Sequence, residues 1–110
     1  MTEQDQNEEK DLLRVGANSP AKAVASAIAH SIYETRTCKI RAVGAGAINQ
    51  AIKACAIARG YTAPRGLDIG FIPGFTTIKS HDGDVSALVL TVFVSIKPVF
   101  QAQIPYIYKK

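Results

Sequence analysis

The feature that most constrains the fold is a run near the C-terminus, VSALVLTVFVSIK at residues 85–97, in which wholly aliphatic positions alternate with a less hydrophobic set. This period of two is typical of a β-strand, and five aliphatic residues fall on one of its faces: Leu88, Leu90, Val92, Val94 and Ile96. The second face is milder but still largely apolar. A strand that is apolar on both faces belongs in the middle of a sheet, so the chain must supply strands on either side and a covering layer.

The other segments of the chain supply the neighbouring strands and the covering layer. Asn18-Ser19 followed by Pro20 predicts an N-cap and a proline at the first helical position, and Gly60 predicts a helix end. Pro73-Gly74 interrupts a strand, which favours an edge or a bulge there. Periodicity and turn residues together predict strands at 12–16, 38–43 and 67–79, helices at 20–35 and 47–59, a loop at 62–66 and a hairpin turn at Asp82-Gly83.

The predicted order is β-α-β-α-β-β. Because crossovers between parallel strands are right-handed, both helices lie on one face of the sheet. The fold class is therefore α/β in the broad sense, an α+β domain of two layers. With 110 residues, of which 47% are hydrophobic, the chain suffices for a single core.

Charge divides the chain into parts. Residues 1–11 hold five acidic side chains against one lysine, a net charge of −4, and predict a disordered acidic leader. Residues 12–110 hold 12 basic and 4 acidic side chains, a balance of +8 that suits a polyanionic partner. The predicted domain spans 12–97, and an apolar extension at 98–110 is expected to be ordered against the sheet or a neighbouring subunit over 99–107.

Several protein classes are disfavoured. No apolar run is long enough for a membrane span, and the two cysteines, Cys38 and Cys55, sit in apolar runs as expected of core residues in a cytoplasmic protein. The two histidines lie far apart, so no metal site is expected. No serine, histidine or acidic set suggests catalysis, and we expect neither an enzyme nor a cofactor.

A glycine turn, Gly44-Ala45-Gly46, links a strand to a helix in the manner of a phosphate-binding loop. A dinucleotide fingerprint needs a third glycine where Asn49 stands, and its ribose-binding acid would end a strand, whereas Asp68 begins one. The turn still exposes backbone N–H groups at a helix start, which favours an anion. Alternatively, the glycines only permit a tight turn with close packing.

The second helix is apolar on most sides. One stripe can face the sheet, and a second stripe would remain uncovered in an isolated two-layer fold: Ala47, Ala54, Ile57 and Ala58. Exposed contiguous apolar surface marks an interface, so this stripe predicts a homodimer.

The segment AVGAGAINQAIKACAIARGYTAPRGLDIGFIPGF, residues 42–75, resembles the stage V sporulation protein S family of bacteria, and the resemblance extends over about 12–97. That family in turn resembles the Alba chromatin proteins of archaea. The resemblance implies a mixed four-stranded sheet of order 1-2-4-3 with two helices on one face, a homodimer, nucleic-acid binding, and a regulatory role in sporulation or cell development without enzymatic activity. Alba proteins carry cations where this chain has Asn18-Ser19, Gly44-Ala45-Gly46 and Asn49-Gln50.

Because those cations are missing, we expect weak binding, with either DNA or RNA as the partner. The candidate phosphate contacts are Lys22, Arg41, Lys53, Arg59, Arg65 and Lys79. The predicted nucleic-acid site comprises Asn18, Ser19, Lys22, Gly44, Ala45, Gly46, Asn49, Gln50, Lys53, Arg65 and Lys79. Two alternatives stay open: a protein-interaction or assembly module without nucleic-acid binding, and a sensor of a small anionic ligand at the glycine turn.

Overall fold

The computed structural model describes residues 12–95. The predictions for the acidic leader and the apolar extension lie outside these residues. The elements follow the predicted order: β1 (Leu12–Val15), α2 (Ala21–Thr35), β2 (Thr37–Ala42), α3 (Ala45–Thr62), a 3₁₀ turn (Ala63–Arg65), β3 (Ile69–Ile78) and β4 (Val85–Val94).

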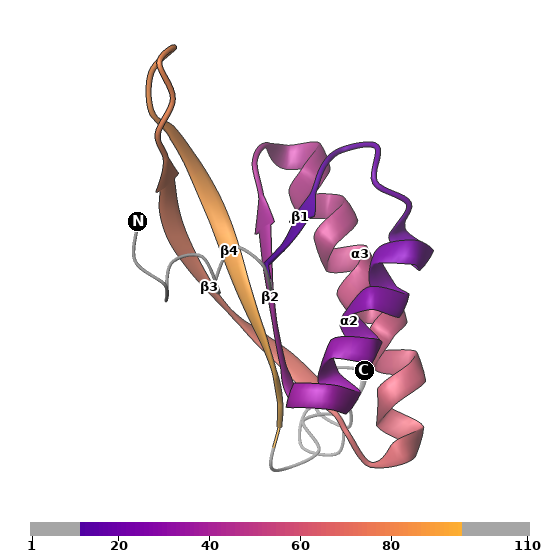
Figure 1. The fold of residues 1–110 in the computed structure, drawn as a ribbon. Coiled ribbons are helices and arrows are strands. Elements are labelled where there is room, and N and C mark those ends of the chain that lie inside the picture. The colour runs from indigo at the N-terminus through magenta and orange to yellow at the C-terminus, as the bar shows by residue number, and fades with distance from the viewer. Residues whose placement is uncertain (1–11, 96–110) are drawn as a thin grey trace, which may run out of the picture.

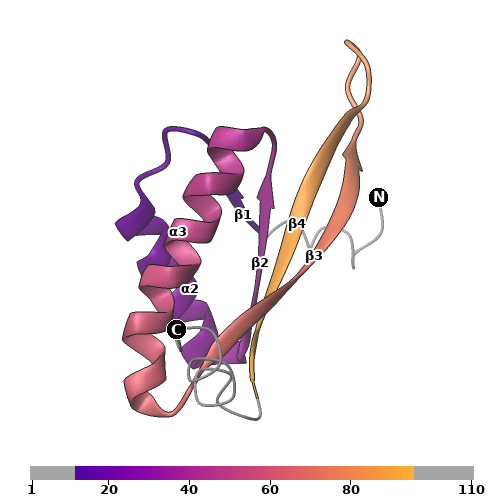
Figure 2. The same ribbon diagram turned by 180° about the vertical axis from the view of Figure 1, so that it is seen from behind.

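The four strands form one mixed sheet of order β1-β2-β4-β3, and both helices cover the same face of it (Figures 1 and 2). β1 runs parallel to β2, whereas β4 is antiparallel to both β2 and β3. The apolar run of β4 thus lies in the interior of the sheet, as its two apolar faces predicted. No helix within the described residues is both long and apolar enough to cross a bilayer.

β3 is an edge strand, and this position explains its proline. The predicted interruption at Pro73-Gly74 is wrong, because β3 is continuous from Ile69 to Ile78 and Pro73 stands opposite Leu90 in the register. An edge strand has one side without a neighbour, so the missing N–H of a proline need not break a ladder. The hairpin turn between β3 and β4 falls where Asp82-Gly83 predicted it, and Gly83 adopts a φ of 118° there.

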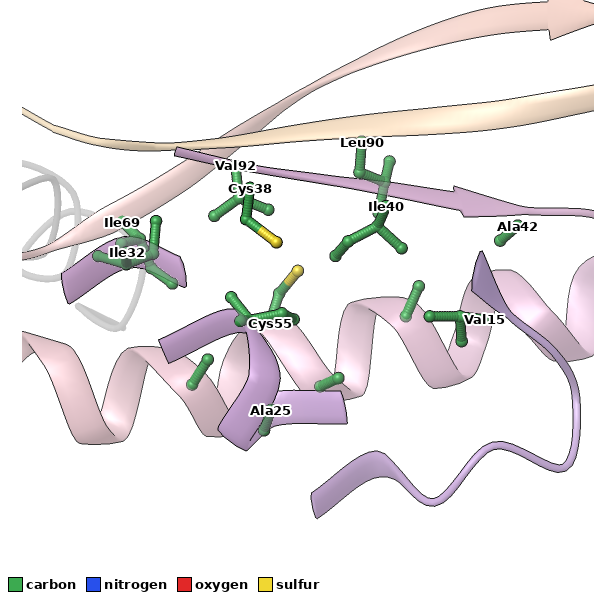
Figure 3. Packing of buried hydrophobic residues seen from close by; sticks show 14 of the residues in the cluster. Val15, Ala25, Ile32, Cys38, Ile40, Ala42, Cys55, Ile69, Leu90 and Val92 are labelled. Carbon is green, nitrogen blue, oxygen red and sulfur yellow. The ribbon is translucent and has the colours of Figure 1, made fainter. Parts of the chain in front are cut away.

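The core fills the space between the sheet and the helices (Figure 3). Ile28 and Ile32 of α2 are fully buried, as the spacing of four residues predicted, and they share the cluster with Ile40 of β2 and Val92 of β4. Cys38 and Cys55 are buried free thiols in the same cluster, which confirms their expected role as core residues.

The bounds of α3 differ from the prediction at both ends. The helix begins at Ala45, and it continues through Gly60 to Thr62 before running into the 3₁₀ turn that occupies the predicted loop. Gly60 costs about 1 kcal/mol in a helix interior relative to alanine, but burial of Ala58 and Thr62 on either side holds the helical path. The helical segment ends instead at Gly66, whose φ is 84°.

The second apolar stripe of α3 is covered within the monomer. Ala47, Ala54 and Ala58 are at most 2% exposed, and Ile57 is half-buried. The helix α2 lies alongside α3 (Figure 1), and its own buried alanines, Ala25 and Ala29, allow the two backbones to approach closely. The expectation that this stripe is left open for a second subunit is therefore wrong, because small residues let α2 cover it.

Candidate functional site

The starts of the two helices meet at one edge of the molecule. The Gln50 side-chain Nε2 in α3 donates a hydrogen bond of 2.8 Å to the carbonyl oxygen of Ser19, in the connection between β1 and α2. The same two segments touch at Gly46, where an added Cβ would lie 3.0 Å from the Cβ of Ala17. The structure thus brings Asn18 and Ser19 together with the glycine turn. We call this surface, formed by residues 17–22 and 43–53, the helix-start edge.

Ser19 shapes this edge in a way that the sequence did not predict. Its hydroxyl oxygen accepts a hydrogen bond of 2.8 Å from the Gly16 N–H, and its own N–H donates to the Gly16 carbonyl oxygen at 3.1 Å. Ser19 therefore closes the turn before α2, while Pro20 occupies the N-cap position itself and no side chain caps the helix. The N–H groups at the start of α2 are left without a side-chain acceptor.

The start of α3 is similarly uncapped. Gly44 forms its N-cap with a φ of 90°, and its carbonyl oxygen accepts a bond of 3.0 Å from Ile48 N–H. Gly44, Ala45 and Gly46 are all exposed. Neither described helix has an acidic residue in its first turn, so the positive end of each helix dipole, about half a unit charge, is not neutralised locally.

The remaining predicted phosphate contacts differ in how close they lie to the two helix starts. Lys22 and Asn49 are exposed near the starts of their helices, whereas the exposed Lys53 lies about 12 Å along α3 from Ala45. The β3–β4 hairpin extends past the same end of the molecule (Figure 1), and there Lys79 is paired with Asp84 at 3.1 Å, with both side chains exposed. The positive charge of Lys79 is therefore paired with the carboxylate of Asp84.

Arg65 does not belong to this edge. It follows the C-terminal end of α3, a helix of 18 residues and thus about 27 Å long, whose N-terminal end carries the glycine turn. Its guanidinium lies 4.8 Å from the centre of the Tyr33 ring, in a cation–π contact. The candidate contact Arg65 therefore lies apart from the glycine turn, because the length of α3 separates them.

Two hollows lined by described residues lie away from the glycine turn. One of about 270 Å³ lies between α3 and the β3–β4 pair and is lined mainly by apolar side chains, Ile52 and Phe71 among them. A more open one lies between α2 and the end of α3, beside Tyr33 and Arg65. Neither includes Gly44, Ala45 or Gly46, so neither supports a small-ligand sensor at that turn.

The buried thiols do not provide a nucleophile. Burial raises the pKa of Cys38, and it raises the pKa of Cys55 to about 11, so both remain protonated at neutral pH. Within residues 12–95 no three histidine, cysteine or acidic side chains gather in a way that could hold a metal ion.

Two helices on one face of a sheet of order β1-β2-β4-β3, with both helix starts and a long hairpin at one end, define an α+β protein of the Alba-like class. Among solved structures, Alba from Thermoplasma volcanium matches with a TM-score of 0.54 and 20% identity, over 74% of this chain and 98% of that chain. The family model for stage V sporulation protein S matches residues 11–95. The chain belongs to that family.

Proposed function

We propose that this chain is a non-enzymatic, dimeric, cytoplasmic regulator of the sporulation type, and that it binds DNA or RNA weakly at the helix-start edge. The observation that carries the proposal is the hydrogen bond from Gln50 to Ser19. Through it, two uncapped helix starts share one surface without an acidic side chain in either first turn. Such a surface favours phosphate groups.

The strength of binding follows from the charges present. Each subunit offers Lys22 and two helix dipoles at the helix starts, with Lys53 further along α3, and a dimer doubles the set. Each displaced counterion contributes about 0.9 to the salt slope on duplex DNA. We expect micromolar or looser affinity with a slope of roughly −2 to −4.

The test is a titration of labelled duplex DNA and RNA at two salt concentrations, comparing wild type with a Lys22→Glu/Lys53→Glu variant. We expect the variant to lose binding. A matched control is Arg65→Glu, which changes one charge at the far end of α3 and should leave affinity nearly unchanged. If the double variant binds as wild type does, or wild type fails to bind at low salt, the nucleic-acid proposal fails.

A second function, assembly without nucleic acid, is favoured by a separate observation. Phe75 on the helix side of β3 is 83% exposed, and Ile52 on α3 is 45% exposed. Ile52 and the half-buried Phe71 both line the hollow between α3 and β3, so apolar surface extends from this hollow along the hairpin. We propose that the homodimer forms on this surface, in place of the alanine stripe covered by α2. If nucleic-acid binding fails while this surface associates, the chain acts as an assembly module.

A further inference from the structure

The face of the sheet opposite the helices carries positive charge that no acidic side chain within residues 12–95 shares. Cys38, Ile40 and Ala42 of β2 are buried towards the helices, so the alternating residues Thr37, Lys39 and Arg41 lie on the opposite face. Among the described elements, none covers this face (Figures 1 and 2). We call it the open face.

Three cations lie close together there. Arg14 of β1 stands directly opposite Arg41 in the parallel register, and Lys39 is two residues from Arg41, about 6.6 Å along the strand. Like charges directly opposite each other in a sheet are destabilising, so this arrangement does not serve stability. The described acidic side chains lie elsewhere: Glu34 on α2, Asp68 before β3, and Asp82 and Asp84 in the hairpin.

An aromatic ring lies on the same face, in the row of the sheet next to that of Lys39. Phe93 of β4 stands between Thr37 of β2 and Gly70 of β3 in the register. A Cβ added to Gly70 would lie 3.6 Å from the ring Cζ, so the ring extends over a position that has no side chain. Phe93 is only half-buried. The glycine beside it leaves the ring accessible from the open face.

The next row of the sheet combines a cation with an exposed apolar side chain. Lys39 of β2, Thr91 of β4 and Ile72 of β3 stand side by side in the register, and Ile72 is 61% exposed. The open face therefore changes from positively charged to apolar across the sheet. Cations lie on β1 and β2, the aromatic ring and a hydroxyl on β4, and an exposed aliphatic side chain on β3.

We propose that the open face binds a single strand of nucleic acid, with bases packed on Phe93 and Ile72 and phosphates at Arg14, Lys39 and Arg41. Single strands are bound by combining aromatic stacking surfaces with a positive track for the backbone, commonly on an exposed sheet. A duplex keeps its bases stacked inside and would leave Phe93 unused. The open face is on the opposite side of the sheet from the helices, so this site can hold or fail independently of the helix-start edge.

The acidic leader is the competing occupant. Residues 1–11 carry a net charge of −4 and join the fold at Leu12, which stands opposite Lys39 in the register. A tethered segment has a high effective concentration. The apolar half of the open face, however, has no counterpart in this polar leader, whereas it suits nucleobases. The single strand therefore matches both halves of the surface.

The test measures fluorescence anisotropy of a short labelled oligouridine with the full chain. Phe93→Leu keeps an apolar side chain but removes the ring, and it should weaken binding about tenfold. Lys39→Gln/Arg41→Gln should lower the salt slope on the single strand by about 1.4, because each lost phosphate contact contributes about 0.7. Because Lys39 and Arg41 lie on the surface, the double variant should fold as wild type does, which thermal unfolding checks.

The control variant Arg65→Gln removes a cation beside Tyr33 in the helix layer, outside both proposed sites, and should leave oligouridine binding intact. The proposal is overturned if both open-face variants bind oligouridine as wild type does, or if only Lys22→Glu/Lys53→Glu loses it. It is also overturned if Lys39→Gln/Arg41→Gln speeds tryptic cleavage after Lys10 without changing oligouridine binding, since the leader would then be the occupant.

Discussion

Arg59, near the end of α3, and Asp68, in the connection to β3, form a bidentate ion pair. The Nε–Oδ1 distance is 2.5 Å and the Nη2–Oδ2 distance is 3.1 Å. The Asp68 carboxylate also accepts a bond from the Ile69 N–H, and its carbonyl oxygen accepts one from the Ser95 N–H. Asp68 thus joins the end of α3 to β3 and to the end of β4. Arg59 was a candidate phosphate contact in the sequence, and in the structure its guanidinium is paired with Asp68.

Removing this carboxylate should destabilise the fold. Asp68 is 13% exposed, and its hydrogen bond raises the pKa of Arg59. Asp68→Ala should lower the free energy of unfolding by about 1–3 kcal/mol, because bonds to charged groups are among the stronger ones. Urea unfolding measures the change, with Asp82→Ala in the exposed hairpin turn as a control near zero. Equal stabilities of the two variants would contradict this role.

Stability should fall at alkaline pH because of Cys55. Burial raises its thiol pKa from an ordinary value of 9.0 to about 11, so the native state keeps a proton that the unfolded chain releases between these values. The free energy of unfolding should therefore decrease as pH rises through this interval, by about 2 kcal/mol at pH 11. Urea titrations at pH 7, 9 and 11 measure this, and the decrease should be smaller in Cys55→Ala. A decrease of the same size in that variant would rule out this thiol as its source.

Two glycines of the same helix should respond differently to alanine. Nothing lies within 4 Å of a Cβ placed on Gly60, so Gly60→Ala should raise the free energy of unfolding by about 0.5–1 kcal/mol. A Cβ on Gly46 would lie 3.0 Å from that of Ala17, so Gly46→Ala should be destabilising despite the same gain in helix propensity. Thermal unfolding of both variants checks the sign of each effect. A stabilising Gly46→Ala would show that the contact between the two connections is loose.

The dimer proposal predicts which apolar position matters. Ile52→Lys in the hollow between α3 and β3 should give a monomer, because a charge would be buried in the interface. Val43→Lys is a matched control, since Val43 is equally exposed at 45% but does not line this hollow, and it should remain dimeric. Sedimentation at several concentrations distinguishes the two. A wild-type chain that sediments as a monomer at high concentration would refute the dimer.

Local patterns determined the order of elements and much of the core. The alternation at 85–97 identified β4 as an interior strand, and Val24, Ile28 and Ile32 defined the inward side of α2. Pro73 correctly indicated an edge, since only there can a strand tolerate a missing N–H. These predictions succeeded because hydrophobic periodicity and the missing N–H of proline depend only on residues that are close in sequence.

The ends of α3 and the cover of its alanines could not be predicted in this way. Gly60 stops a helix in isolation, but in the fold the burial of Ala58 and Thr62 outweighs its propensity. Ala54 and Ala58 form an apolar stripe in sequence, and only the approach of α2 shows that this stripe is internal.

The candidate sites show the same division. The sequence by itself determined the glycine turn, the basic balance of residues 12–110 and the family resemblance. Only the tertiary structure decided that Gln50 reaches Ser19, that Arg65 lies at the far end of α3, and that Arg59 is held by Asp68. It also placed Arg14 opposite Arg41, 27 positions away in the chain. Such pairings depend on register and helix packing, which join distant residues and leave no signal in either segment alone.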